Sequence, residues 1–103
     1  MKRIERITEM ERCLHASEEA IKSLSNALDA YEANRKSLQK LADYYGSTRW
    51  MKDFEADEAG RLPNDLQRGV LSEDAVYDLL TDHHEVILRM TRIVTGAIEG
   101  KLL

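Results

Sequence analysis

Hydrophobic residues recur at alternating spacings of three and four over most of the first half of the chain. The repeating positions are Ile7, Met10, Leu14, Ser17, Ile21, Leu24, Leu28, Tyr31, Arg35, Leu38, Ala42 and Tyr45, and Ile4 and Leu41 widen the pattern at its two ends. The polar residues Ser17 and Arg35 weaken the seam locally. This spacing is typical of a helix with a heptad seam. No Pro or Gly interrupts it, so the pattern predicts one long helix over residues 3–45, and nothing requires a bend near Asn34.

A second helical pattern fills the last third of the chain. Its apolar positions are Val76, Leu79, Leu80, His83, Val86, Ile87, Met90, Ile93, Val94, Ala97 and Ile98. Ser72 is a strong N-cap residue, and Glu73 and Asp74 follow it in the first turn, where the helix dipole favours acids. Leu71 and Val76 have the spacing of a hydrophobic staple. We expect a long helix over residues 72–99, with Gly96 and Gly100 fraying its end and a loose tail from Lys101 to Leu103.

Residues 46–71 connect the two long helices. Gly46 directly follows the last periodic residue, which predicts a left-handed C-cap, and Ser47 or Thr48 is placed to cap a short helix over residues 49–58. Trp50 and Phe54 are four residues apart and share one face of that helix, which Gly60 ends.

The end of the connection contains further turn residues. Pro63 fixes one backbone angle, and the residues after it predict a single helical turn over 66–68. Gly69 is expected to take a positive φ and reverse the chain.

The predicted fold is all-α: an antiparallel hairpin of two long helices with a short helix and an ordered connector between them. The 103 residues suit one domain. At about 1.5 Å per residue the first helix is roughly 60 Å long and the last roughly 40 Å. The folded-back helix would therefore leave Ile4, Ile7, Met10 and Leu14 uncovered, which predicts a coiled-coil-like homodimer joined through the N-terminal helices.

Composition narrows the function classes. The net charge of −4 and the mixed signs of the N-terminal arm, in which basic residues alternate with acids, argue against a general attraction for nucleic acid. A nucleic-acid-binding dimer that uses this arm stays an alternative. The single cysteine, Cys13, forms no disulfide within the chain, and the charged N-terminus differs from a signal peptide, so we expect a cytoplasmic protein.

Acidic and histidine side chains raise a metal-dependent hydrolase as a second alternative. Asp74, Asp78 and Asp82 share a helix face at intervals of four, His83 and His84 follow, and Asp53 and Asp57 lie on the short helix. The acid stripe lies off the apolar face, and no second helix carries a paired motif of the kind that di-metal bundles use. Asp53, Glu55, Asp57 and Glu58 begin like a calcium loop, but Gly60 stands at the wrong position. A solvated acidic face with local salt bridges is the favoured interpretation, and we predict no catalytic residues, metal or cofactor.

Three motifs give the chain a family resemblance. They are Arg6-Ile7-x-x-Met10-Glu11, Tyr44-Tyr45-Gly46-Ser47 with Trp50-x-x-Asp53-Phe54-Glu55, and Leu62-Pro63-x-Asp65-Leu66-x-Arg68-Gly69-Val70-Leu71-Ser72-Glu73-Asp74. With them the chain resembles, over nearly its full length, a family of small bacterial and phage-associated proteins known as domain of unknown function 4298. The resemblance implies a single-domain fold and carries no activity, cofactor or partner.

The sequence therefore predicts a helical protein–protein interaction module, a dimeric adaptor or inhibitor. The expected interaction surface comprises Ile4, Ile7, Met10, Leu14, Arg49, Trp50, Asp53 and Arg68.

Overall fold

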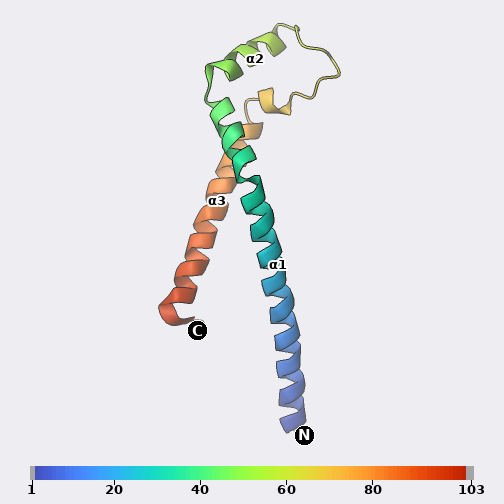
Figure 1. Ribbon diagram of the computed structural model, residues 1–103, viewed down its shortest axis with the longest axis vertical. Coiled ribbons are helices and arrows are strands. Elements are labelled where there is room, and N and C mark those ends of the chain that lie inside the picture. The colour runs from blue at the N-terminus through green and yellow to red at the C-terminus, as the bar shows by residue number, and fades with distance from the viewer. Residues whose placement is uncertain (1, 102–103) are drawn as a thin grey trace. The chain divides into compact units, whose positions relative to one another are not determined.

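The computed structural model describes residues 2–101. The regular secondary structure of these residues is helical, and they include no β-strand. The elements are α1 (Lys2–Tyr45), α2 (Thr48–Glu58), the short 3-10 helix η1 (Gly69–Leu71), α3 (Ala75–Gly96) and the single π-turn η2 (Ala97–Lys101) (Figure 1). The all-α prediction is confirmed. Leu102 and Leu103 of the predicted loose tail lie outside the described residues.

The chain divides into two compact units, residues 1–38 and residues 39–103, and each is described by itself. The predicted antiparallel hairpin and the single domain therefore stay predictions. None of the helices in residues 2–101 is long and apolar enough to cross a membrane.

Helix α1 has 44 residues and begins one residue before the predicted start. It is helical without interruption through Asn34, so the chain does not fold back there. Ion pairs between neighbouring turns line its charged faces: Arg12 pairs with Glu9, and the His15 ring lies 3.7 Å from Glu11 and 3.6 Å from Glu18. Such pairs three and four residues apart support an exposed helix.

Ser47 separates α1 from α2. Its Oγ accepts a hydrogen bond from the Trp50 amide at 3.3 Å, as the predicted N-cap should. The prediction of a left-handed Gly46 is wrong, because Gly46 does not have a positive φ. Its amide donates to the Ala42 carbonyl at 3.3 Å, which continues the helical hydrogen bonding of α1 until Ser47 starts the next helix.

Gly60 ends α2 in a Schellman motif. It has φ +69°, its amide donates to the Asp57 carbonyl at 3.0 Å, and the Arg61 amide donates to the Ala56 carbonyl at 3.0 Å. This pair of bonds satisfies carbonyls that the end of a helix leaves open, and the positive φ explains why a Gly stands there.

The connection from Arg61 to Asp74 differs from its prediction in two places. The turn that begins at Pro63 spans residues 63–66, and the Leu66 amide donates to the Pro63 carbonyl at 3.2 Å. Residues 66–68, which were predicted to form a helical turn, are not helical. Gly69 does not have a positive φ and instead begins η1. The single helical turn of the connection is therefore η1, three residues later than the predicted turn at residues 66–68.

Ser72 caps α3 as predicted. Its backbone is extended (φ −71°, ψ 146°), and its Oγ accepts from the Ala75 amide at 3.1 Å. Regular α3 hydrogen bonding begins at Ala75, later than the predicted residue 72, because Glu73 and Asp74 form a turn between cap and helix. At the other end the α-helix stops at Gly96, and Gly100, with φ +88°, closes the π-turn.

The core of the second unit is small. Among the described residues only Trp50, Leu71 and Val76 are buried hydrophobic residues, one each from α2, η1 and α3. Helix η1 contacts both α2 and α3, so the connector holds these elements together.

Candidate functional site

An aromatic cluster forms the centre of the connector. The Trp50 ring stacks on Phe54, with centroids 5.2 Å apart, and meets the Tyr45 ring edge to face at 5.3 Å. The Trp50 indole N–H donates to the Val70 carbonyl at 2.8 Å, so the start of α2 is tied to η1. The spacing of four residues on α2 explains the Trp50–Phe54 stack, and the cluster is the packing core of the connector.

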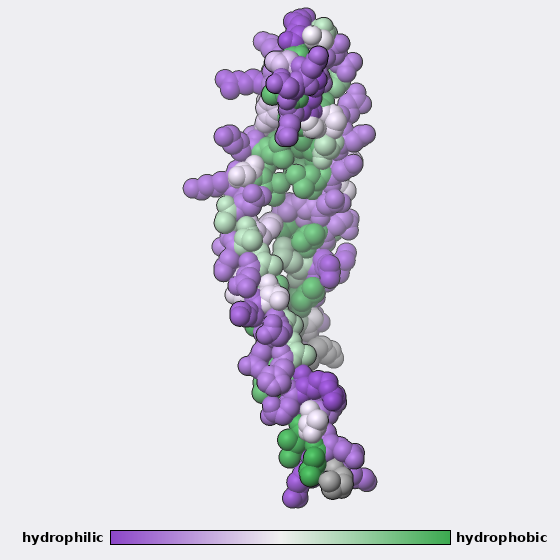
Figure 2. All heavy atoms as spheres, turned by 90° about the vertical axis from the view of Figure 1, so that its right-hand side faces the viewer, coloured by the Kyte–Doolittle hydropathy of each residue, from purple (hydrophilic) through white to green (hydrophobic). Residues whose placement is uncertain are grey.

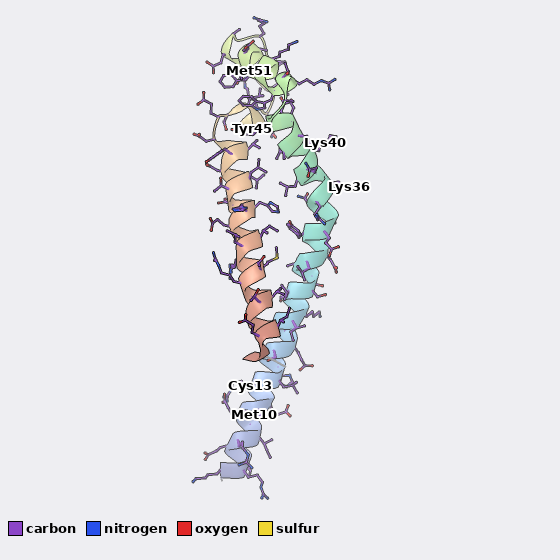
Figure 3. All side chains as sticks on the ribbon, turned by 90° about the vertical axis from the view of Figure 1, so that its left-hand side faces the viewer. Met10, Cys13, Lys36, Lys40, Tyr45 and Met51 are labelled. Atoms are coloured by element: carbon purple, nitrogen blue, oxygen red, sulfur yellow. The ribbon has the colours of Figure 1, made fainter. Side chains whose placement is uncertain are left out.

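Tyr45 ties the end of α1 to the start of α3. Its hydroxyl donates to the Glu73 carbonyl at 3.1 Å, and Figure 3 shows Tyr45 in the last turn of α1. This bond joins residues 28 apart in sequence and fixes where α3 begins relative to the end of α1.

Tyr44 and Asp53 form a short polar contact beside the aromatic cluster. The Tyr44 hydroxyl donates to the Asp53 carboxylate at 2.6 Å. This hydrogen bond raises the pKa of Tyr44 to about 12, and partial burial and the carboxylate charge add to the effect. Tyr44 is therefore a hydrogen-bond donor at neutral pH and not a general base.

Arg68 and Asp57 form the only partly buried ion pair between charged side chains that the structure places in residues 39–101. The guanidinium lies 2.8 Å from the carboxylate, and the two side chains are 31% and 25% exposed. The bond joins the loop before η1 to the last turn of α2. An ion pair at this depth stabilises the loop modestly.

A groove of about 260 Å³ runs between these two polar pairs. We define the connector groove by its lining residues, Tyr44, Asp53, Leu62, Leu66, Gln67, Arg68, Val70 and Leu71. Its floor is apolar and its polar groups come from Tyr44, Asp53 and Arg68. Both charged side chains are engaged with neighbours, which favours binding or structural roles over proton transfer.

A second hollow, of about 390 Å³, lies on the other side of Gln67 and Val70. It is lined by Leu41, Gln67, Gly69, Val70, Ala75, Val76 and Leu79, and its lining is mainly apolar. Leu66, Val70 and Leu79 are 48%, 41% and 44% exposed, so apolar surface continues across both hollows.

The metal candidates do not form a site. Among residues 2–101 there is no group of three or more His, Cys, Asp or Glu side chains placed to hold a metal ion. Asp53 and Asp57 bond to Tyr44 and Arg68 respectively, while Asp74, Asp78 and Asp82 are exposed along one helix, and His83 and His84 follow them. The convergence that the hydrolase alternative requires is absent from the described residues.

The predicted interaction residues fall into two separate sets. Ile4, Ile7, Met10 and Leu14 on α1 are 57%, 54%, 56% and 52% exposed, and Figure 2 shows apolar surface at the N-terminal end of α1. We call these four side chains the N-terminal stripe. In the second unit Asp53 and Arg68 line the connector groove and Arg49 is exposed, whereas Trp50 is buried and serves the core.

Sequence reasoning missed the partners that form the groove. The sequence predicted Arg49, Asp53 and Arg68 as interaction residues. It did not predict the hydrogen bond from Tyr44 to Asp53 or the one from Trp50 to the Val70 carbonyl. Asp53 lies nine residues after Tyr44 across a turn, so the one available signal was the Ser47 cap, which reverses the chain between them.

Comparison with known proteins gives a family and no function. The family model for a domain of unknown function, DUF4298, matches residues 7–93. A search of curated proteins and a search of solved structures each returned no match. The matched range takes in most of α1, all of α2, the connector and most of α3, and so contains all three motifs on which the resemblance was noted, apart from Arg6. The chain therefore belongs to the DUF4298 family of domains of unknown function.

Proposed function

We propose that this chain is a non-enzymatic helical interaction module that acts as a dimer, with the N-terminal stripe as its contact surface. The observation that carries the proposal is the exposure of four large apolar side chains on one side of α1, each more than half exposed. Single exposed apolar residues are common on protein surfaces, but a regular stripe of them marks an interaction site.

The length of α3 supports an intermolecular partner. Tyr45 holds Glu73 at 3.1 Å, so α3 starts beside the end of α1. Residues 75–101 would extend about 40 Å even if the π-turn kept a helical rise, and would reach back along α1 only to about residue 18. The N-terminal stripe lies at residues 4–14, nearer the N-terminus than that point.

The free energies indicate a weak, reversible dimer. Fully burying a Leu, Ile or Met side chain stabilises by about 1.5–3 kcal/mol, so covering the exposed half of one contributes about 1 kcal/mol. Eight such side chains in two copies contribute roughly 8–10 kcal/mol, which is comparable to the 4–15 kcal/mol that association costs. The most favourable balance of these two ranges is about −6 kcal/mol, so we expect a dissociation constant of tens of micromolar or above, as suits an adaptor that exchanges partners.

Two aspartate substitutions one residue apart test the proposal. Ile7→Asp places a charge in the stripe, whereas Thr8→Asp places the same charge on an exposed polar position of the same turn. Sedimentation velocity over a concentration series should show the wild type and Thr8→Asp associating and Ile7→Asp monomeric. Equal behaviour of the two variants would contradict a contact through the stripe.

The adaptor role needs a second surface, and the connector groove supplies one. Its apolar floor and its polar groups from Tyr44, Asp53 and Arg68 have the composition of a binding surface for a peptide segment. The groove lies in residues 39–103 and the stripe in residues 1–38, so the two surfaces share no residue. A Leu66→Asp variant should keep the dimer and lose any partner that the wild type retains in affinity purification.

A further inference from the structure

The side chains along and beside the N-terminal stripe also bear on the orientation in which two copies of α1 pair. We propose that the second copy binds in parallel and in register along α1, so that each residue faces its own counterpart. This inference rests on the proposed dimer and adds its orientation.

The order of side chains along the seam favours a two-stranded parallel pair. In the heptad that begins at Ile7, the first core position is filled by Ile7, Leu14 and Ile21, and the second by Met10, Ser17 and Leu24. The heptad of Ile21 and Leu24 combines a β-branched residue at the first core position with Leu at the second, which is the arrangement that parallel dimers prefer. Ile21 and Leu24, which continue the seam, are 68% and 58% exposed.

The residues that flank the seam distinguish the two orientations. Glu11 and Glu18 stand on one flank, and Arg6 stands on the other. Parallel helices bring unlike flanks together, so that Arg6 of one copy faces Glu11 of the other, five residues further along. Antiparallel helices bring like flanks together and would place Glu11 and Glu18 against the same carboxylates of the second copy. Charges at these flanking positions set the orientation of paired helices.

Glu11 lies four residues before His15 in its own helix, whereas Glu18 also has Lys22 four residues further along. His15 is the group nearest to both carboxylates, at 3.7 Å from Glu11 and 3.6 Å from Glu18. Arg12 is paired with Glu9 instead. Arg6 of a second copy therefore complements Glu11, and the symmetry of a parallel pair forms this contact twice, whereas Glu18 faces Cys13 of the second copy.

A parallel pair has a consequence for the proposed function. Because α1 is one continuous helix from Lys2 to Tyr45, pairing in register brings the two Tyr45 ends to the same end of the pair. Both connectors then begin at that end, and a partner with two binding segments would engage them together with an increased effective concentration.

Distances between spin labels test the orientation without altering the seam. Glu5 and Asn26 are exposed and lie off the seam, and the exposed Cys13 provides a native labelling position between them (Figure 3). Nitroxide labels are attached to Cys13 in the wild type, and to Glu5→Cys and Asn26→Cys, each combined with Cys13→Ala. Sedimentation velocity first establishes that each labelled protein forms the wild-type dimer.

The expected result is the same short distance, below about 30 Å, at all three positions, since helix axes in a pair lie 8–10 Å apart. In an antiparallel pair the axial separation of identical labels grows by about 3 Å per residue from the centre. Because residues 5 and 26 are 21 residues apart, their two axial separations would add up to at least about 63 Å, so at least one of the two distances would exceed about 30 Å. That outcome would overturn the parallel pairing while leaving the dimer intact. A labelled wild type that stays monomeric would instead overturn the proposed function itself.

Discussion

Replacing Trp50 by Ala is the perturbation that the structure predicts to be most damaging. Trp50 is 9% exposed, stacks on Phe54 at 5.2 Å and donates its indole N–H to the Val70 carbonyl at 2.8 Å. It is one of only three buried hydrophobic residues among those described, so no larger core compensates for its loss.

The magnitude follows from these contacts. Truncating a buried aromatic side chain to Ala lowers the free energy of unfolding by about 3–5 kcal/mol, and the lost hydrogen bond adds about 1 kcal/mol. A domain of this size has a total of roughly 5–10 kcal/mol. The variant Trp50→Ala should therefore leave the second unit largely unfolded, while Trp50→Phe, which loses mainly the N–H donor, should cost about 1–2 kcal/mol and stay folded.

Urea unfolding followed by far-ultraviolet circular dichroism measures both variants, at one fixed protein concentration because a dimer links stability to concentration. Met51→Ala is the matched control, since Met51 adjoins Trp50 on α2 and is 50% exposed; it should cost less than about 1 kcal/mol. If Trp50→Ala were no more destabilising than Met51→Ala, the aromatic cluster would not be the core of the connector.

Three further outcomes are expected. The difference in near-ultraviolet absorbance between the wild type and Tyr44→Phe should titrate at about pH 12, and Asp53→Asn should move it toward the ordinary tyrosine pKa near 10. Because the folded state holds the Tyr44 proton more tightly than the unfolded state, the Tyr44–Asp53 hydrogen bond contributes its full free energy to stability below pH 10 and loses it as the pH rises to 12. A difference in the free energy of unfolding between wild type and Tyr44→Phe that stays unchanged over that range would contradict the hydrogen bond. Gly60→Ala should lower the free energy of unfolding by about 1–2 kcal/mol because φ is +69°, whereas Gly69→Ala, where φ is not positive and no atom lies within 4 Å of a new Cβ, should be neutral or stabilising; equal thermal shifts would argue against the Schellman cap. Ser72→Ala should cost about 1 kcal/mol by thermal unfolding and Ser72→Asp less than half of that, and a neutral Ser72→Ala would show that the hydroxyl does not cap α3.

Local chemistry made much of the fold predictable. The seam from Ile7 to Tyr45 has no helix-breaking residue, so α1 follows from spacing alone. The caps at Ser47 and Ser72 depend on a side chain and an amide three residues later, and both form as expected. Gly60 is the clearest case, because its position after α2 leaves few other conformations for the helix end.

The predictions of a positive φ at Gly46 and Gly69 were wrong, and they show what short-range sequence patterns do not determine. Gly46 and Gly60 follow helices in similar ways, yet only Gly60 takes a positive φ. After Gly46 the chain enters a new helix within two residues, and the Ser47 cap can start it directly from the end of α1. Gly69 does not reverse the chain, because the turn that closes on Pro63 has already done so.

The connector groove could not be read from the sequence because its contacts are non-local. Trp50 reaches Val70 twenty residues away, and Arg68 reaches Asp57 eleven residues away. Several other carboxylates lie at similar sequence distances from Arg68, and the path of the loop decides which of them Arg68 contacts. The acidic stripe of α3 shows the converse, since a regular spacing of Asp74, Asp78 and Asp82 produces an exposed face and no metal site among residues 2–101.

The central claim is that the N-terminal stripe pairs two copies of the chain, and the molar mass of the intact protein tests it most directly. Size-exclusion chromatography with light scattering, run from low to high micromolar loading, should show the mass rise from near 11.8 kDa toward twice that value, as expected for a weak dimer of an 11.8 kDa chain. A mass that stays at 11.8 kDa up to several hundred micromolar would contradict the account.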